Sequence, residues 1–252
     1  MRIFFIALLL LSIAACSNEK KDPTDGWSAS RIYNTAKEYL ESGNYEEAVK
    51  YFESLEARYP FGRFAEQAQL EIAYAYYKYD EPELAIAAAD RFIRLHPRHE
   101  NVPYAYYLKG LANFNRGQTL IDKILPRDYS ENDTKPLKQA YQDFSVIIQR
   151  YPNSPYAEDS KDRLAYLRNL VANHELHVAD YYMRRKAYLA AAKRCEHIIE
   201  NYQGSDIIPD TLAIMTTAYT RLGMEDLASD SKRVLEHNFS EDSEKLLKEY
   251  SY

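Results

Sequence analysis

The sequence predicts an all-α fold built from five helix-turn-helix repeats, with about ten or more helices in total. First, residues 31–60 read at helical period as two short amphipathic helices joined at Ser42-Gly43-Asn44. Second, the spacing of small and large side chains in this segment recurs four more times along the chain. Third, a proline stops the second helix of each of the first three repeats: Pro60, Pro97 and Pro152.

The repeats share one template of small and bulky positions. When Ala48 is counted as position 20, Ala36 falls at position 8, and both are small enough to let two helices approach closely. In the first repeat the bulky residues of the template are Tyr39, Phe52 and Leu55. The residues at the small and bulky template positions of the second to fifth repeats are, repeat by repeat, Ala73, Tyr76, Ala85, Ala89 and Phe92; Gly110, Asn113, Ala140, Phe144 and Ile147; Ala179, Tyr182, Ala191, Cys195 and Ile198; Thr216, Tyr219, Ala228, Lys232 and Leu235. The pattern resembles the tetratricopeptide repeat (TPR). It predicts one TPR domain over residues 28–252, with repeats at about 29–62, 66–99, 103–154, 172–205 and 209–242.

The chain opens with a pattern typical of an export signal. The basic lead Met1-Arg2 precedes an apolar run that is too short to span a bilayer, so we expect residues 1–15 to be a signal peptide. Ile13-Ala14-Ala15-Cys16 resembles a bacterial lipobox, in which the leader is cut before a cysteine that carries lipid. The alternative is an ordinary A-x-A cleavage site beside a chance cysteine. On the lipobox interpretation, Cys16 bears acyl chains such as palmitate, each contributing about 0.8 kcal/mol per buried CH₂.

Residues 16–27 are polar up to Trp27 and predict a lipidated, flexible tether. In bacteria with the common sorting rule, an aspartate after the lipidated cysteine retains the protein at the inner membrane. Ser17 stands at that position, which favours the outer membrane.

Three segments depart from the plain repeat. Residues 115–136 insert into the third repeat and form either a variable loop or a contact surface. Residues 156–185 contain no glycine or proline and predict one long helix, which could brace the first repeats against the last. The charged tail at 241–252 is expected to extend the last helix.

The chemistry of the chain favours binding over catalysis. A formal net charge of −6 argues against nucleic acid as the main partner. His174 and His177 are three residues apart, whereas a helical zinc motif needs four, so no metal site is expected. No phosphate loop, nucleophile elbow or CxxC motif occurs. Cys195 stands at core position 24. We therefore expect neither enzymatic activity nor a cofactor other than the lipid on Cys16.

TPR proteins commonly bind peptides along the first helices of their repeats. The groove-facing positions of the TPR family select an aromatic and apolar set in the first three repeats: Tyr33, Lys37, Leu70, Tyr74, Tyr77, Tyr107 and Phe114. The alternative is that several of these tyrosines pack against the long fourth-repeat helix. Arg194, at position 23 of the fourth repeat, is the candidate partner contact, against the alternative of a solvated arginine.

Taken together, these features resemble the BamD family, also called YfiO or ComL, the lipoprotein subunit of the outer-membrane β-barrel assembly (BAM) machinery. The segments that carry the resemblance are Tyr59-Pro60-Phe61-Gly62-Arg63, Gln69–Lys78, Asp90–Pro97, Gly110-Leu111, Arg127–Asp133, Asp143–Ser160 and Val178–Arg185. The resemblance covers nearly the whole mature chain, except that Gln203 replaces the closing proline of repeat four and that the tail does not match.

The resemblance implies a scaffold that is lipid-anchored at the periplasmic face of the outer membrane and aids insertion of β-barrel proteins into that membrane. It implies binding of a POTRA domain of the BAM barrel subunit through the last repeats, association with other BAM lipoproteins, and receipt of unfolded outer-membrane proteins by the first repeats. The alternative is a periplasmic TPR adaptor lipoprotein in cell-wall synthesis, division or DNA uptake.

Overall fold

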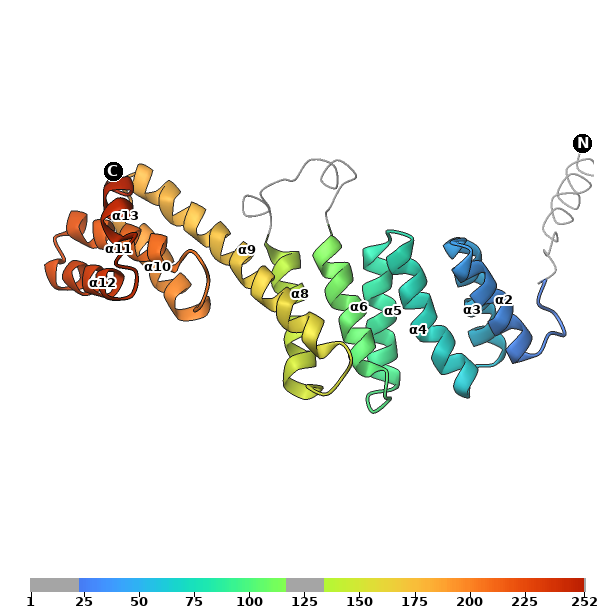
Figure 1. Ribbon diagram of the computed structural model, residues 1–252. Coiled ribbons are helices and arrows are strands. Elements are labelled where there is room, and N and C mark those ends of the chain that lie inside the picture. The colour runs from blue at the N-terminus through green and yellow to red at the C-terminus, as the bar shows by residue number, and fades with distance from the viewer. Residues whose placement is uncertain (1–22, 117–133, 252) are drawn as a thin grey trace, which may run out of the picture. The chain divides into compact units, whose positions relative to one another are not determined.

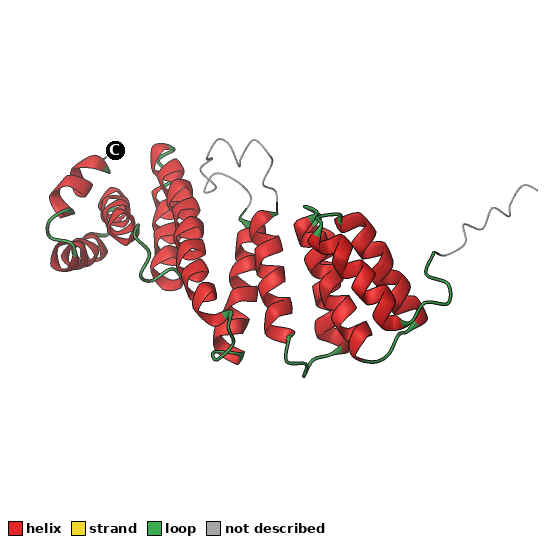
Figure 2. Ribbon diagram, turned by 45° about the vertical axis from the view of Figure 1, so that its right-hand side comes forward, coloured by secondary structure: helices red, strands yellow, loops and turns green. Residues whose placement is uncertain are grey.

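The computed structural model of the chain describes residues 23–116 and 134–251, and within these ranges all regular secondary structure is helical (Figure 2). Cys16 and residues 117–133 of the insertion lie outside the described residues. The helices are α2 (Ala29–Glu41), α3 (Tyr45–Arg58), α4 (Arg63–Lys78), α5 (Pro82–Leu95), α6 (Val102–Asn115), α8 (Lys135–Arg150), α9 (Ala157–Arg184), α10 (Tyr188–Asn201), α11 (Ile208–Leu222), α12 (Glu225–Asn238) and α13 (Ser243–Glu249) (Figure 1).

The chain divides into two compact units, and the boundary falls inside α4, between Glu71 and Ile72. The first unit contains α2, α3 and the start of α4. The second contains the end of α4 and all later helices. Within each unit successive helices pack as antiparallel pairs, which confirms the helical-repeat solenoid predicted by the sequence.

The small template positions are buried in every repeat. Residues at positions 8 and 20 are at most 9% exposed where a value is given: Ala36, Ala48, Ala73, Ala85, Ala140, Ala179, Ala191, Thr216 and Ala228. Gly110 takes position 8 of the third repeat, where a Cβ atom would lie 2.6 Å from the ring of Phe144. Close approach of α6 and α8 therefore depends on the missing side chain. Lys232, at position 24 of the last repeat, is exposed, in keeping with a terminal repeat.

The first helix of four repeats ends in the same backbone turn. Position 15 has a positive φ each time: 81° at Gly43, 62° at Asp80, 60° at Lys186 and 70° at Gly223. The next residue's N–H then donates to the carbonyl of the tyrosine at position 11, over 2.9–3.0 Å: Asn44 to Tyr39, Glu81 to Tyr76, Ala187 to Tyr182 and Met224 to Tyr219. This is the Schellman arrangement, which satisfies carbonyls left open at a helix end.

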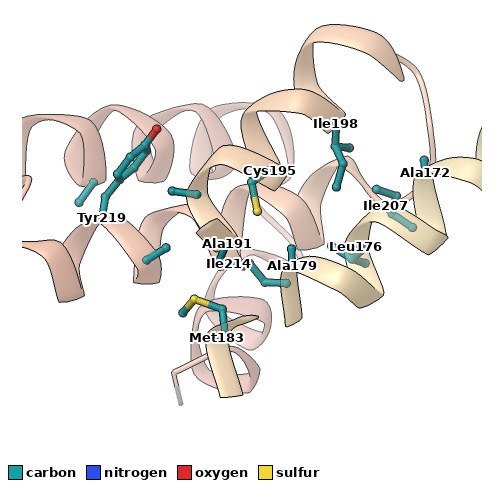
Figure 3. Packing of buried hydrophobic residues seen from close by; sticks show 13 residues of the cluster. Ala172, Leu176, Ala179, Met183, Ala191, Cys195, Ile198, Ile207, Ile214 and Tyr219 are labelled. Carbon is teal, nitrogen blue, oxygen red and sulfur yellow. The ribbon is translucent and has the colours of Figure 1, made fainter. Parts of the chain in front are cut away.

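Helix α9 is one uninterrupted helix of 28 residues, as the sequence predicted. Its first half contributes Leu167 and Val171 to a core with Phe144 of α8. Its second half contributes Leu176 and Ala179 to a core with α10 and α11 that includes Cys195 (Figure 3). Cys195 is fully buried, and burial raises the pKa of its thiol to about 12, so it behaves as a small apolar core residue.

The tail does not extend the last helix, and that expectation is wrong. Helix α12 ends at Asn238, and α13 is a separate helix that packs against α11. Leu246 is 8% exposed in a core with Leu212, and the Tyr250 hydroxyl donates to Asp210 Oδ1 over 2.9 Å. The amphipathic pattern of the tail predicted a helix, but not that this helix is separate from α12 and packs against α11.

Packing begins before the expected domain start at residue 28. Thr24 is 2% exposed and its hydroxyl lies 2.7 Å from that of Ser54 on α3. Trp27 stacks on Tyr51, with ring centroids 6.1 Å apart, and its carbonyl accepts a hydrogen bond from the Tyr59 hydroxyl. Residues 23–27 therefore belong to the folded part of the chain, although composition assigned them to the tether.

Candidate functional site

The candidate groove residues of the first unit are held by an acidic partner. Glu71 Oε1 accepts from the Tyr33 hydroxyl over 3.4 Å and pairs with Lys37 Nζ over 2.9 Å. Partial burial, and then Glu71, raise the pKa of Tyr33 to about 12. Leu70 is only 7% exposed, so it presents little surface to a ligand. Tyr33 and Lys37 remain partly accessible on α2.

On the second unit, Tyr74 and Tyr77 are both half-buried near the end of α4. The Tyr77 hydroxyl accepts a hydrogen bond from Asn115 Nδ2 over 3.2 Å. This bond ties α4 to the end of α6, immediately before the insertion. Both side chains are partly exposed, and a bound side chain could cover the exposed part.

Tyr107 packs against the start of the long helix, which was the alternative raised for these tyrosines. Its ring stacks on Tyr156 at 5.1 Å and meets Phe144 edge-on at 5.8 Å. Its hydroxyl donates to Asp159 Oδ2 on α9 over 2.7 Å. Tyr107 thus joins α6 to α9 and offers a ligand only the part of its ring that these contacts leave open.

Phe114 lines a pocket of about 360 Å³ together with Phe144, Asp159, Asp162, Arg163, Tyr166 and Leu167. Its ring meets Tyr166 edge-on, with centroids 6.0 Å apart, and Tyr166 is 53% exposed. Arg163 and the two aspartates place charges at the edge of this aromatic pocket. The pocket is large enough for one apolar side chain.

Arg194 is not simply solvated. Its Nη1 donates over 2.6 Å to Oε2 of Glu175, which is 3% exposed in the middle of α9. Lys138 of α8 reaches the other oxygen of the same carboxylate over 3.3 Å. Burial acts to raise the pKa of Glu175, but the hydrogen bond and charge of Arg194, with those of Lys138, hold it below its usual range. This three-helix cluster escaped the sequence analysis because its residues have no periodic spacing.

Buried charges such as that of Glu175 are paired, because burial of an isolated charge is unfavourable in free energy. One carboxylate faces two cations, so the cluster carries a net positive charge. The side chains of Arg194 and Lys138 are 36% and 44% exposed. The remaining guanidinium donors can therefore meet an external carboxylate.

Two classes of site are absent from the residues that the structure describes. No three His, Cys, Asp or Glu side chains there come together to hold a metal ion. None of the described helices is both long and apolar enough to cross a membrane.

Comparison with known proteins decides the family. The model of the YfiO family, described as outer membrane lipoprotein, matches residues 26–234. The chain belongs to the YfiO family. Helices α2 to α11, including the long α9, and the Glu175 cluster all lie within the matched range, which ends inside α12.

Several relatives of this YfiO-family chain carry the same name, outer membrane protein assembly factor BamD. The protein of Neisseria meningitidis serogroup A is 45% identical over 243 residues, covering 94% of this chain and 91% of the relative. That of Xylella fastidiosa strain Temecula1 is 41% identical, covering 94% and 82%. That of Vibrio cholerae is 36% identical, covering 92% and 96%. Similarity therefore covers 92–94% of this chain and 82–96% of each relative.

Proposed function

We propose that the chain is a non-enzymatic subunit of the machinery that assembles β-barrel proteins in the outer membrane. The observation that carries this proposal is the similarity, over more than nine-tenths of the chain, to relatives named assembly factors. An all-helical repeat fold supports it, since such folds provide extended surfaces for binding other proteins. The subunit would act as a scaffold and would receive unfolded barrel proteins before insertion.

Anchorage by lipid on Cys16 completes the proposal. The family description as outer membrane lipoprotein and the lipobox at Ile13-Ala14-Ala15-Cys16 support a position at the periplasmic face of the outer membrane. The covalent lipid is the only attached group that the proposal requires.

Depletion of the protein from cells tests this function. Loss of folded β-barrel proteins from the outer membrane, with induction of the envelope stress response, is the expected result. A septation, cell-wall or competence defect with normal barrel proteins would instead support the adaptor function. Purification of the protein from detergent-solubilised membranes should recover the barrel subunit and other lipoproteins of the machinery.

The proposed substrate surface consists of the half-buried rings on the first helices of repeats one to three. An extended peptide presents alternate side chains to one face, so a barrel protein's terminal strand could place aromatic rings against Tyr74 and Tyr77. Aromatic pairs contribute about 0.5–1.5 kcal/mol each beyond area burial. Together with the burial of the rings, and less the cost of ordering the peptide, a few such pairs are expected to give binding on the order of micromolar, which permits release.

The double change Tyr74→Ala and Tyr77→Ala should weaken binding of a C-terminal strand peptide at least tenfold, as measured by fluorescence anisotropy. Tyr79→Ala is the matched control, because this tyrosine follows the same helix and is 48% exposed. Helical content should stay unchanged in both. Equal affinity of the double variant and the wild type would place the peptide elsewhere.

The proposed contact with a POTRA domain uses the free donors of Arg194. Arg194→Glu would place two carboxylates together, so loss of binding could reflect disruption of the Glu175 cluster. Arg194→Lys keeps the positive charge but loses the bidentate fork. It should reduce co-purification of the barrel subunit while thermal stability stays close to wild type. Lys193→Ala is the control, since Lys193 is 68% exposed and pairs with Glu196.

A further inference from the structure

Helices α6, α8 and α9 lie side by side in the second unit and line a pocket of about 360 Å³, the aromatic pocket, which contains Phe114 (Figure 1). Phe144 and Leu167 are fully buried, so they lie at its base. Phe114 is half-buried, and Tyr166, which meets it edge-on, is 53% exposed, so these two rings lie nearer the opening. An aromatic side chain of a ligand would therefore find ring partners on the walls of this pocket.

Three charged side chains of α9 stand at the edge of the aromatic pocket: Asp159, Asp162 and Arg163. They precede Tyr166 by one or two helical turns, which places them on the same side of α9. Arg163 is already paired, because its Nε donates to Asp159 Oδ2, which also accepts from the Tyr107 hydroxyl. Partial burial acts to raise the pKa of Asp159, but the hydrogen bonds of Arg163 and Tyr107 hold it below its usual range. Asp159 is thus ionised at neutral pH and compensates the charge of Arg163.

The second carboxylate, that of Asp162, remains uncompensated within the described part of the chain. Asp162 is exposed, and it forms no ion pair or hydrogen bond with any residue that the structure describes. Lys161, the preceding residue, pairs with Glu158 and does not line the pocket. Two carboxylates and one guanidinium leave the opening with a net negative charge. A ligand cation is therefore attracted there, whereas a ligand carboxylate that approached Arg163 would be repelled by Asp162.

The spacing of Asp162 and Tyr166 matches that of side chains in an extended peptide. The two residues are separated by about 6 Å along α9, since four residues of helix rise roughly 1.5 Å each. An extended chain presents every second side chain to one face, at intervals of about 6.6 Å, or roughly 3.3 Å per residue. A peptide lying along α9 with a ring beside Tyr166 thus places the side chain two positions away at Asp162.

We propose that the aromatic pocket selects barrel-protein strands in which a lysine or arginine stands two residues from an aromatic side chain. The ring enters between Phe114 and Tyr166, and the cation pairs with Asp162. This inference rests on the proposed receipt of unfolded barrel proteins, and it names the strand chemistry that this receipt would favour. The pocket adjoins the proposed substrate surface, because the Tyr77 hydroxyl accepts a hydrogen bond from Asn115, the residue after Phe114.

Peptide binding to the mature, detergent-solubilised chain tests the charge preference, with fluorescence anisotropy as the readout. The probes are labelled, C-terminally amidated strand peptides with one phenylalanine and with lysine, glutamine or glutamate at both positions two residues from it. The wild type should bind the lysine peptide about two- to tenfold more tightly than the glutamate peptide, because one gains an exposed ion pair and the other a repulsion. The difference should disappear at about 1 M salt, where the Debye length is roughly 3 Å.

Asp162→Lys should reverse the order of the lysine and glutamate peptides, because the charge at the opening changes sign. Glu200→Lys is the matched control, since it makes the same charge change at an exposed position of α10 and should leave the order as in the wild type. Tyr166→Ala removes one wall and should weaken binding of all three peptides about two- to tenfold, the equivalent of one aromatic pair. Its control is Tyr181→Ala, on the same helix, 51% exposed and outside the pocket. Helical content should be unchanged in every variant.

Equal affinities for the three peptides, or tighter binding of the glutamate peptide, would overturn the charge preference. Undiminished binding by Tyr166→Ala would show that the ring lies elsewhere and would overturn the pocket as its site. In both cases the wild type still binds strand peptides, so the proposed function would stand. Failure of the wild type to bind any of the three peptides would instead contradict the receipt of unfolded barrel proteins, and this inference with it.

Discussion

Gly110 is the residue at which two helices of the third repeat come closest. A methyl group there would lie 2.6 Å from two ring carbons of Phe144, which is itself fully buried. Glycine in a helix interior usually costs about 1 kcal/mol relative to alanine. At this position the usual preference is expected to reverse, because the added methyl group would force the ring out of its packing against Tyr107.

Gly110→Ala should therefore lower the free energy of unfolding by about 1–3 kcal/mol, the usual range for overpacking. Urea denaturation followed by circular dichroism measures the change. The cost should shrink when Phe144→Leu is combined with it, since the ring is then absent. An equal cost in both backgrounds would show that Phe144 is not the cause.

Glu175 shows a second residue-scale effect, in which a buried charge depends on two partners. Because its pKa lies below the usual value, its ionised form stabilises the folded state. This contribution is complete above the unfolded-state pKa, near the ordinary 4.5, and is lost as the pH falls through the lower folded-state pKa.

Glu175→Gln should destabilise the protein at neutral pH by about 1–3 kcal/mol, because charged hydrogen bonds are replaced by weaker ones. The difference between variant and wild type should narrow as the pH falls below about 4.5. Denaturation midpoints at several pH values measure this. The control is Glu158→Gln on the same helix, where the side chain is 82% exposed and should matter little. A difference that does not vary with pH would contradict the assignment.

At the scale of the element, the recurring turn at position 15 places two ordinary residues in a conformation that favours glycine. Gly43 and Gly223 adopt it without strain, whereas Asp80 and Lys186 have side chains that crowd the backbone. Asparagine and aspartate tolerate this region better than lysine. Lys186 is therefore the more strained position of the two.

Lys186→Gly should stabilise the protein by about 0.5–1 kcal/mol, the relief of left-handed strain less the extra freedom of glycine in the unfolded chain. The converse change, Gly223→Ala, should cost about 1 kcal/mol. No atom lies within 4 Å of the added Cβ at Gly223, so the backbone alone would account for that loss. Thermal denaturation of both variants measures the effect, and opposite signs are expected.

Sequence patterns predicted the repeat helices well, because the same packing requirement recurs in each helix pair. Small residues at positions 8 and 20 repeat because every helix pair must pack closely, and burial confirms them. The pairing of Glu175 with Lys138 and Arg194 could not be predicted, because it joins residues 37 and 19 positions apart with no period. The direction of α13 depends on Leu246 and Tyr250 meeting α11, which the tail alone does not encode. The proposed groove residues stay a prediction, although Tyr107 and Leu70 are more enclosed than the pattern suggested.

For the whole molecule, retention at the membrane is expected to depend on one atom, the sulfur of Cys16. Cys16→Ala should abolish lipid attachment, and the protein should accumulate as precursor and fail to sediment with membranes. Immunoblotting of fractions and mass spectrometry of the mature amino terminus measure this outcome. Cys195→Ala is the control, because Cys195 is buried and should not affect localisation. An unmodified Cys16 in the wild-type protein would contradict the lipobox interpretation.

The continuity of α9 has a consequence for how the second unit unfolds. Repeat proteins commonly melt from one end, because each repeat touches only its neighbours. Here a single rod of 28 residues, about 42 Å long at 1.5 Å per residue, is shared by two cores. Partial unfolding of either core therefore destabilises the backbone hydrogen bonds of α9 itself. We expect hydrogen exchange along α9 and its two neighbours, α8 and α10, to proceed at one common rate, as a single cooperative block.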